Sequence, residues 1–267
     1  MPEGDTIHRT ATTLRAVIDG HTLDRSRFAH PTRQGGASGL GGTSILVPGE
    51  RIGPIEARGK HLLIGFSGGL TLHTHLQMSG SWHTYRPGER WQRPSRQMVV
   101  ALTSTSAEAV CFNAPVVELL DPSSFARHPQ LNALGPDLCV PGFDADEVAR
   151  RLQRTDQATP MGVVLLDQTI ASGIGNVFKS EALWARSLDP FAPLSSVDAE
   201  TRQAVYRTAS DQLRANLAET GPRRTVPQGL AVYDRAGQPC RRCGTPIRTR
   251  RQGSAGRSTW WCPACQT

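Results

Sequence analysis

The chain has 267 residues, a length that suits one large domain or two small ones. Hydrophobic residues make up 38% and charged residues 20%, which excludes a disordered or collagen-like chain. No apolar run approaches the ~18 residues of a membrane span, and the first residues lack an apolar signal-peptide core, so we expect a cytoplasmic protein. The net charge of +7 is compatible with a polyanionic partner.

The first half of the chain is predicted to form a helix followed by short strands. Apolar residues at helical spacing predict a helix over Asp5–Asp19, which Gly20 would end. Gln34–Thr43 and Tyr85–Arg96 are expected to be loops, the first of them Gly-rich. Apolar or alternating runs between Gly and Pro predict strands at Ile45–Val47, Ile52–Glu56, His61–Phe66, Leu70–His75, Met98–Thr103 and Ala109–Asn113.

The second half of the chain is predicted to be helical up to its last segment. The four predicted helices cover Asp144–Arg154, Pro160–Ala171, Asn176–Ser187 and Asp198–Thr220. Strands at Thr245–Arg251 and Ser258–Trp261 would then form a β-hairpin. The fold class is therefore α+β. The expected divisions are a β-sandwich-like domain at 1–125, a hinge or linker at 126–143, a helical domain at 144–222 and a four-cysteine segment at 223–267.

Four of the six cysteines lie in two C-x2-C pairs near the C-terminus. These residues are Cys240, Cys243, Cys262 and Cys265. Their spacing predicts one structural Zn²⁺ held by four thiolates, a closed site with no open position for chemistry. Two disulfides are the alternative, and a reducing cytosol disfavours them. Cys111 and Cys139 are expected to be buried fillers, and no organic cofactor is expected.

The basic residues are concentrated around this cysteine segment. Nine arginines lie between Arg223 and Arg257, against a single acid, Asp234. An arginine-bearing hairpin held by zinc is a candidate nucleic-acid contact, and a solvated basic face is the alternative. Elsewhere lysine is scarce, because Lys60 and Lys179 are the only lysines of the chain. A coding bias toward arginine accounts for this scarcity.

The N-terminus offers a nucleophile. Removal of Met1 would leave Pro2 with a terminal secondary amine, which is neutral more often than a lysine amine at pH 7. Such an amine can attack an aldehyde or acetal carbon and form an iminium, with Glu3 as the neighbouring acid or base. The alternative is that Pro-Glu only caps the following helix.

A glycine-rich turn before the third predicted helix is a candidate phosphate site. Gly173 and Gly175 allow a tight turn, and Asn176 then opens a helix whose free N–H groups can bind a phosphate. A plain corner between two helices is the alternative. Lys179, one turn into the helix, is expected to contact phosphate or to be exposed.

The segment His73–Trp82 carries two further candidates. His73 and His75 lie two residues apart on a predicted strand, where they could share a metal, although one packed and one free histidine is the more common arrangement. Met78, before Ser79 and Gly80, is a candidate exposed apolar tip that could wedge between bases. A core methionine is the alternative.

These motifs occur in an order that resembles the Fpg/Nei (formamidopyrimidine-DNA glycosylase / endonuclease VIII) family of bifunctional DNA glycosylases. The matching segments run from end to end: Met1–Gly4, Arg58–Leu63, His75–Gly80, Leu166–Glu181 and the cysteine hairpin with Gly256–Cys262. Pro2–Ile7 and Gln77–Met78 look most like the actinobacterial Nei type. The resemblance implies an N-terminal helix with a β-sandwich, then a helical domain with a helix-two-turns-helix motif and a zinc β-hairpin.

The resemblance also implies a mechanism. The enzyme flips a damaged nucleotide out of DNA, and the Pro2 nitrogen attacks C1′ of its sugar and displaces the base as a Schiff base forms. Glu3 would protonate the sugar ring oxygen. Lys60 would contact phosphate and transfer a proton in β-elimination, and Arg257 would hold the flanking phosphate and assist δ-elimination.

The same resemblance assigns contacts to DNA. Asn176 matches a phosphate-binding asparagine, and Gln77 and Met78 match the loop that fills the gap left by the flipped base. We also expect His75 and Lys179 to contact DNA.

Two departures bear on the substrate. The stretch Phe112–Pro115 replaces the Arg-Arg-Phe-Gly wedge of the Fpg branch, which favours oxidised pyrimidines over 8-oxoguanine. Ala133 stands where endonuclease VIII has an arginine, which puts one DNA contact in doubt.

The sequence therefore predicts a DNA N-glycosylase (hydrolase) and AP lyase of base excision repair that nicks DNA by β,δ-elimination. The expected partner of this monomer is damaged double-stranded DNA at the nucleoid, with single-stranded or bubble DNA left open. The alternatives are an AP lyase or abasic-site binder without glycosylase activity, and a non-catalytic zinc-finger protein.

Overall fold

The computed structural model describes residues 2–29, 46–218 and 221–267. The chain divides into two compact units. The N-terminal unit contains Pro2 and Thr6–Asn132, and the C-terminal unit contains Glu3–Asp5 and Ala133–Thr267. The predicted loop Gln34–Thr43, together with Met1 and Ile45, lies outside the described residues.

Helix α1 (Gly4–Ile18) begins one residue before its predicted start. Its apolar stripe, Ile7, Ala11, Leu14 and Ile18, is fully buried, as the helical spacing requires. Gly20 follows with a φ of +76°, a left-handed conformation that glycine adopts without a steric penalty, and so ends the helix.

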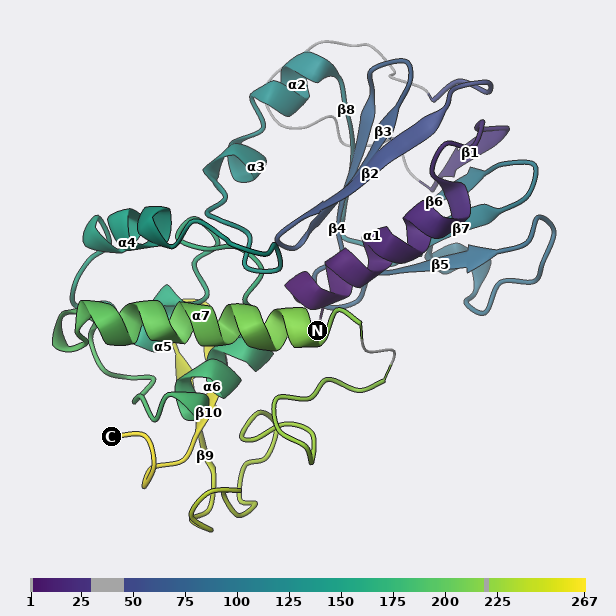
Figure 1. Cartoon of the computed structure of the whole chain (residues 1–267). Helices are drawn as coiled ribbons and strands as arrows, with labels where there is room; N and C mark the ends of the chain where they lie inside the picture. Colours follow the sequence, from purple (N-terminus) through teal and green to yellow (C-terminus); the bar gives the residue numbers. More distant parts are fainter. Residues whose placement is uncertain (1, 30–45, 219–220) are drawn as a thin grey trace. The chain divides into compact units, whose positions relative to one another are not determined.

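Two antiparallel four-stranded sheets form the N-terminal unit (Figure 1). The first has the order β2 (Ile52–Arg58), β3 (His61–Phe66), β4 (Thr71–His75) and β8 (Val116–Leu120). The second has the order β1 (Arg25–Phe28), β6 (Met98–Thr103), β7 (Glu108–Phe112) and β5 (Ser81–Tyr85). A 3-10 turn, Ser95–Gln97, precedes β6. One core cluster joins both sheets and α1, through residues such as Ile7, Ile64 and Val100, so the predicted β-sandwich is confirmed.

The strand predictions succeeded where apolar runs were continuous. β3 and β6 have their predicted bounds, whereas β1, β5 and β8 were missed. β1 and β5 are edge strands with half-buried polar residues, so they lack the alternation that marks a strand. The strand predicted at Ile45–Val47 is wrong for its described residues, because Leu46 is buried outside any strand and Val47 is 56% exposed.

The segment predicted as a hinge contains two short helices, α2 (Pro122–Ala126) and α3 (Pro129–Ala133). The Asp121 carboxylate caps α2 by accepting hydrogen bonds from the Ser123 and Ser124 amides, a common N-cap arrangement.

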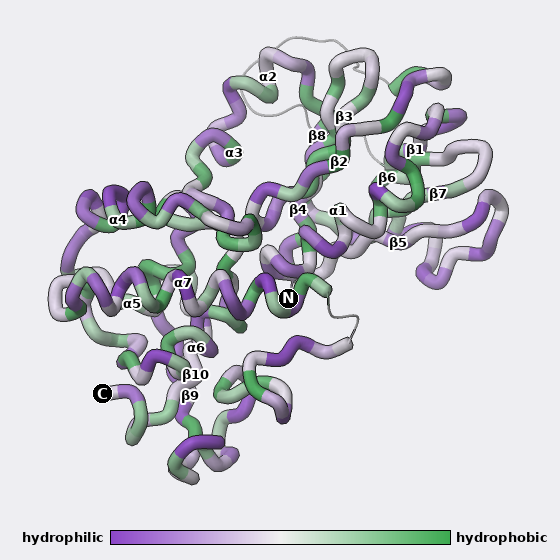
Figure 2. The backbone as a smooth tube through the Cα atoms, viewed as in Figure 1, coloured by the Kyte–Doolittle hydropathy of each residue, from purple (hydrophilic) through white to green (hydrophobic). Residues whose placement is uncertain are grey.

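The C-terminal unit contains four helices and the predicted hairpin. The helices are α4 (Ala145–Gln153), α5 (Met161–Val164), α6 (Asn176–Ala185) and α7 (Ala199–Ala215), with a 3-10 turn at Leu194–Ser196. The hairpin pairs β9 (Arg248–Gln252) with β10 (Arg257–Trp261). α6 is the central helix, since nine of its ten residues are buried. Figure 2 shows hydrophilic and hydrophobic residues alternating along α4 and α7, as expected for helices with one solvent-exposed side.

The helix predicted over Pro160–Ala171 ends at Val164. Asp167 provides the reason, because its carboxylate accepts hydrogen bonds from the amide and the hydroxyl of Thr169. Such local side-chain bonds compete with a helical backbone.

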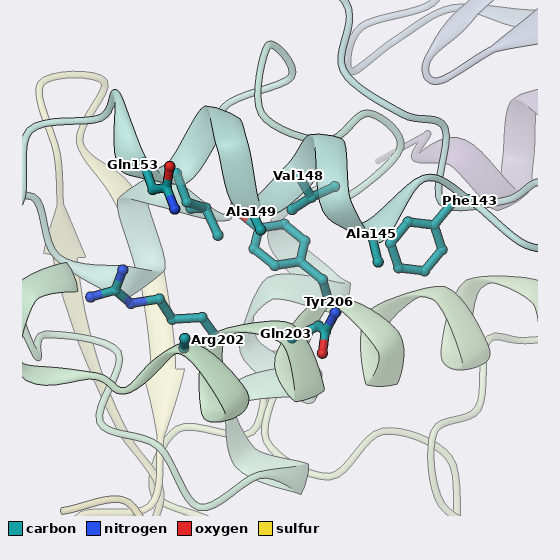
Figure 3. Close-up of a pocket in the computed structure, with 10 residues that line it drawn as sticks. Phe143, Ala145, Val148, Ala149, Gln153, Arg202, Gln203 and Tyr206 are labelled. Carbon is teal, nitrogen blue, oxygen red and sulfur yellow. The ribbon is translucent and has the colours of Figure 1, made fainter.

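A small pocket lies between α4 and α7 (Figure 3), where Val148 and Ala149 face Gln203 and Tyr206. Its volume of about 70 Å³ falls far below the ~300 Å³ at which ligand pockets begin. It is therefore a packing gap. In the described parts of the chain, no helix has the length and apolar character needed to cross a membrane.

Candidate active site and zinc centre

Glu3 is fixed at the start of α6. Its side chain is fully buried, and its carboxylate accepts hydrogen bonds from the amides of Gly175 (3.0 Å), Val177 (2.7 Å) and Phe178 (3.3 Å). An acceptor-only carboxylate at the positive end of a helix dipole is electrostatically favoured. Gly175 must be a glycine, because a Cβ there would lie 2.4 Å from the Glu3 Cδ.

This arrangement corrects one expectation. The amides at the start of α6 were expected to be free for a phosphate, but the Glu3 carboxylate occupies those of Gly175, Val177 and Phe178. The helix terminus therefore holds an anion from the chain itself. The consequence is a rigidly placed acid beside Pro2, which is only partly buried.

Gly4 and Asp5 are also held by specific contacts within the C-terminal unit. Gly4 donates its amide hydrogen to the Gly173 carbonyl at 2.9 Å, and a Cβ on Gly4 would lie 2.7 Å from the Cys139 Sγ. Asp5 is fully buried and accepts two hydrogen bonds of 2.7 Å from the Arg223 guanidinium. This bidentate pair, which sequence reasoning missed, ties the start of α1 to a segment 218 positions away.

Lys60 lies in the N-terminal unit, in the two-residue turn between β2 and β3. Gly59, with a φ of +56°, makes the turn possible. His61 directly follows Lys60, and His75 pairs with His61 across β3 and β4. Burial, followed by neighbouring charges that include Lys60, lowers the pKa of His61 to about 3 and that of His75 to about 4. Both imidazoles are therefore neutral at pH 7.

The loop after β4 presents an apolar tip, as predicted. Met78 is 63% exposed, so the alternative of a core methionine is wrong. Gln77 before it has a φ of +47°, a conformation that a non-glycine residue adopts only when its surroundings hold it. Gly80 closes the turn, since a Cβ there would lie 2.7 Å from the Leu76 carbonyl oxygen. The DNA contacts of Gln77 and Met78 stay predictions.

Asn176 and Lys179 bind strand β10. The Asn176 Nδ2 donates to the Ser258 carbonyl at 2.8 Å, and the Lys179 Nζ donates to the Ser258 carbonyl at 3.3 Å and the Thr259 hydroxyl at 2.8 Å. Both contacts fix the strand whose first residue is the exposed Arg257. The Nδ2 carries a second hydrogen that the Ser258 bond does not use, and the phosphate contact of Asn176 stays a prediction.

Lys179 differs from its prediction. The residue was expected to be exposed or to contact phosphate, yet it is fully buried. Burial, together with the Arg257 charge, lowers its pKa to about 7, although Glu3 acts in the opposite direction. Its amine therefore acts as an internal anchor for the hairpin in this structure.

Several of the nine clustered arginines bind the protein itself. Arg223 pairs with Asp5, Arg241 donates to the Leu230 and Gln228 carbonyls, and Arg242 lies over the Trp184 ring. Arg248, Arg251 and Arg257 remain exposed on the two hairpin strands. The surface available to a polyanion is thus smaller than the sequence count suggests.

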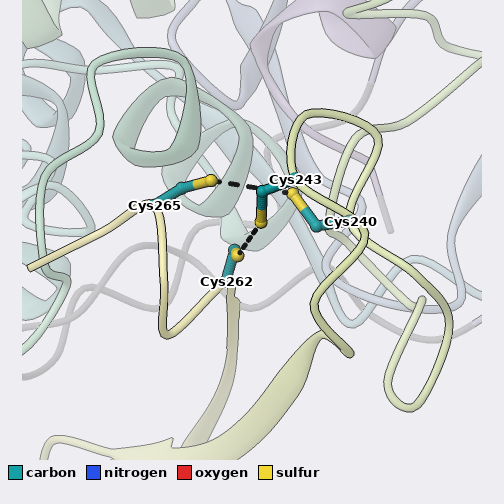
Figure 4. Close-up of side chains that lie close together, drawn as sticks. All are labelled: Cys240, Cys243, Cys262 and Cys265. Atoms are coloured by element: carbon teal, nitrogen blue, oxygen red, sulfur yellow. Dashed lines mark hydrogen bonds between the residues drawn. The ribbon is translucent and has the colours of Figure 1, made fainter.

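The four clustered cysteines form one structural zinc site (Figure 4). Their sulfurs all lie within 4.8 Å of one another, with Cys243 and Cys262 at 3.4 Å and Cys240 and Cys265 at 4.0 Å. A tetrahedral Zn²⁺ with bonds of ~2.3 Å needs sulfurs ~3.8 Å apart, so the donor set fits. Hydrogen bonds from Thr245 lower the pKa of Cys243 to about 6, which favours a thiolate.

Comparison with known proteins follows the same division of the chain. Residues 1–117 match the formamidopyrimidine-DNA glycosylase N-terminal domain, residues 134–225 match the formamidopyrimidine-DNA glycosylase H2TH domain, and residues 237–267 match the zinc finger found in FPG and IleRS. Fold and site together thus define the architecture of a formamidopyrimidine-DNA glycosylase.

Relatives over the full length place the chain more closely. It is 37% identical to a probable endonuclease 8 2 of Streptomyces coelicolor, over 100% of this chain and 94% of that protein. It is 36% identical to DNA-(apurinic or apyrimidinic site) lyase Nei2 of Mycolicibacterium smegmatis (100% and 99%) and 32% identical to endonuclease 8 of Escherichia coli (100% of both). The chain belongs to the formamidopyrimidine-DNA glycosylase and endonuclease 8 family.

Solved structures agree on the fold. A crystal structure of Lactococcus lactis Fpg with an abasic site containing DNA matches with a TM-score of 0.83 at 20% identity, over the whole of both chains. A complex of the LlFpg protein with a THF-DNA and an inhibitor matches with a TM-score of 0.84 at the same identity and coverage.

Proposed function

We propose that this protein is a bifunctional DNA glycosylase and AP lyase of base excision repair. The observation that carries the proposal is the buried Glu3 carboxylate, held by three α6 amides directly after Pro2. These amides stabilise the carboxylate and place a group able to transfer protons directly after the Pro2 amine in the chain. Relatives named endonuclease 8 and DNA-(apurinic or apyrimidinic site) lyase support this reading.

The first step uses the Pro2 amine, once Met1 is removed. Its nitrogen lone pair forms a bond to C1′ of the damaged nucleotide, and the C1′–N bond to the base breaks, so that the base leaves with those electrons and takes up a proton. The Glu3 carboxylate takes the proton from the Pro2 nitrogen and passes it to the sugar ring oxygen as the ring opens and the iminium forms. The α6 amides hold the resulting carboxylate in place.

The second step cleaves the strand. Lys60 removes a C2′ proton from the iminium, and the 3′ phosphate leaves as the new double bond forms. Arg257, exposed at the start of β10, holds the flanking phosphate and assists a second elimination of the 5′ phosphate. Cys240, Cys243, Cys262 and Cys265 contribute by holding the hairpin that presents Arg257.

The proposed partner is damaged duplex DNA. Met78, exposed on a tight loop, and Gln77 beside it would fill the gap left by the flipped nucleotide. We propose that Asn176 and His75 contact the DNA backbone. Oxidised pyrimidines are the proposed substrates, because Phe112–Pro115 replaces the arginine wedge. The proposed active form is a monomer that acts at the nucleoid.

A second candidate is an AP lyase without glycosylase activity. One relative at 36% identity is named as a lyase, and the elimination step needs only Pro2, Lys60 and an abasic sugar. Duplexes with thymine glycol, dihydrouracil, 8-oxoguanine and an abasic site, each also as a single strand, separate the two. Release of free base supports the bifunctional enzyme, whereas cleavage of the abasic site alone supports the lyase.

The test of the nucleophile is borohydride trapping on an abasic-site duplex. The wild type should form a covalent complex, and Pro2→Gly should lose nearly all of it, because a primary amine on a flexible residue replaces the constrained secondary amine. Mass spectrometry of the trapped peptide gives the attachment point. Trapping of Pro2→Gly at the wild-type rate would show that another amine is the nucleophile.

A further inference from the structure

Three histidines and a glutamate form a hydrogen-bonded line in the N-terminal unit. The strand register places His61, His73 and Glu118 on one face of the first sheet, opposite the face that carries Ile64 and Leu72 into the sandwich core. The His61 Nδ1 lies 2.8 Å from the His73 Nε2, and the His73 Nδ1 lies 2.8 Å from the Glu118 Oε2.

His128 is the fourth member of the line and lies at the Glu118 end. The His128 Nε2 lies 3.0 Å from the same Glu118 Oε2, and the His128 Nδ1 accepts the amide hydrogen of Leu131 at 3.2 Å. His73 is fully buried and His61 is 6% exposed. His61, at the other end of the line, is the first residue of β3 and directly follows Lys60 in the turn.

Donors and acceptors fix the direction of every proton in this line. Because the Leu131 amide donates to the His128 Nδ1, the His128 proton is on Nε2 and points at Glu118. Hydrogen bonds, above all the one from His73, lower the pKa of Glu118, so it is a carboxylate that can only accept.

The positions of the ring protons of His73 and His61 follow from these two assignments. The His73 Nδ1 donates to Glu118, and the His73 Nε2 lone pair accepts the Nδ1 proton of His61. The His61 Nε2 then carries a lone pair, on the residue that directly follows Lys60 in the chain.

The geometry excludes a metal as the purpose of this cluster. The ligand atoms of His73, Glu118 and His128 lie within 4.8 Å of one another, close enough to hold an ion. An ion on the His128 Nε2 would require the imidazole proton on Nδ1, where it would face the Leu131 amide hydrogen. Two donors would then oppose each other in a buried position.

We propose that Glu118, His73 and His61 are a proton relay that positions and deprotonates Lys60 during strand cleavage. The inference rests on the proposed function, in which Lys60 removes the C2′ proton. His61, His73 and Glu118 act through Lys60 and are positioning residues, because none of them is required to touch the sugar.

The proton balance of the relay is simple. The Lys60 ammonium gives one proton to the His61 Nε2 and becomes a neutral amine, while the His61 Nδ1 proton passes to the His73 Nε2. His61 ends neutral, and His73 becomes an imidazolium paired with the Glu118 carboxylate 2.8 Å away. The relay thus stores a positive charge beside a negative one, which a lone buried His61 could not do.

The other charged groups on this face are consistent with the relay. β2 contributes Glu56 and Arg58, which pair with each other at 3.1 Å. β4 contributes His75, which is neutral at pH 7 because burial and then Lys60 lower its pKa to about 4. Lys60 is therefore the charge that the relay handles, and Glu118 is the counter-charge.

The test compares two steps of one reaction. His61→Asn and Glu118→Gln are assayed on a preformed abasic-site duplex, in single turnover, for strand cleavage between pH 5.5 and 9 and for borohydride trapping. We expect cleavage at pH 7 to slow about tenfold, as for other outer partners of a functional group. The rise of the rate with pH should move upward by about one unit, and trapping should stay within about twofold of the wild type.

The matched control is His83→Asn in β5. His83 is a half-buried histidine of the other sheet, bonded to the Ser81 hydroxyl at 3.0 Å, so its loss should leave the pH profile unchanged. A proton inventory in mixtures of H₂O and D₂O adds a second readout. It should be curved for the wild type and linear for His61→Asn, since only the former moves several protons at once.

Two outcomes overturn the relay. In the first, cleavage and trapping by the variants both decrease while the pH profile of cleavage stays unshifted, which indicates a structural role. In the second, His61→Asn has the pH profile of the wild type. If Glu118→Gln does not fold, as judged by its melting curve, His61→Asn and ¹⁵N-histidine NMR decide. NMR should show the proton of His61 on Nδ1, and a proton on Nε2 contradicts the relay. Failure of the wild type itself to trap would contradict the proposed function instead.

Discussion

The two units of the molecule use polar groups in opposite ways. In the N-terminal unit, burial keeps the paired residues His61 and His75 uncharged at pH 7. The C-terminal unit carries fixed charges: Arg223 on Asp5, Arg242 on Trp184, and exposed arginines on β9 and β10. In the proposed mechanism the base Lys60 belongs to the first unit and the phosphate-binding Arg257 to the second, two roles for which lysine and arginine are not interchangeable.

The largest effect on this division between the units is expected when the buried Glu3 carboxylate of the C-terminal unit is replaced. Glu3→Gln should lower base release and strand cleavage by about 10²–10⁴-fold, because the proton donor is lost. It should also lower the free energy of unfolding by ~1–3 kcal/mol, since a Gln amide group would face the α6 amide donors. Single-turnover rates and urea denaturation measure the two effects. Asp211→Asn on α7 is a control for the loss of one carboxylate.

Glu3→Gln with near wild-type activity would mean that the α6 amides hold Glu3 for folding alone. In that case the acid of the reaction lies elsewhere.

The next prediction removes the metal. Chelation of zinc, or Cys243→Ala, should release the hairpin and reduce DNA affinity, because Arg248, Arg251 and Arg257 would lose their fixed positions. If all three contact phosphates, the slope of log K against log salt should fall by about three. Binding titrations at several salt concentrations measure the slope. Cys111→Ala, a buried cysteine of the other unit, is the thiol control.

An unchanged slope after zinc removal would show that other residues bind the backbone. The single zinc can be checked directly by metal analysis of the purified protein.

The smallest effect concerns the one lysine within the arginine-rich unit. Burial lowers the pKa of Lys179 to about 7, from about 10.5 in the unfolded chain, so the unfolded state binds more protons between these values. The lysine therefore destabilises the fold below pH 7, and stability should rise as the pH increases from 7 to 10. Relative to Lys179→Met, the wild type should gain at most ~1.4 kcal/mol per pH unit.

Urea denaturation of both zinc-loaded proteins between pH 6.5 and 9.5 measures this difference. A difference that does not change with pH would mean that Lys179 stays charged when buried.

Local motifs were readable from the sequence, and long-range partners were not. The cysteine spacing, the Pro2–Glu3 pair and the exposed Met78 follow from a few adjacent residues, and the continuous apolar runs gave β3 and β6 their bounds. Which atoms Glu3 meets depends on a glycine 172 positions away, and no periodicity reports that.

The same reason explains why the burial of Lys179 and the line of histidines were not predicted. Lys179 was expected to contact phosphate or to be exposed, but α6 is enclosed on nearly all sides, so this charged residue is buried there. The relay needs the pairing of β3, β4 and β8, and β8 was not predicted. The sequence did contain one indication, the two histidines His73 and His75 at alternating positions of a predicted strand. This pattern does not distinguish a relay from a metal site.

The scarcity of lysine has a practical consequence for chemical labelling. Reagents that modify primary amines can meet only Lys60, Lys179 and the chain terminus, and Lys179 is fully buried. In the native protein, acylation or reductive alkylation should therefore report on two amines, that of the half-buried Lys60 and that of the chain terminus. Mass spectrometry of the modified peptides separates the two, and the rate at the Lys60 peptide against pH would give the titration of Lys60 without any substitution.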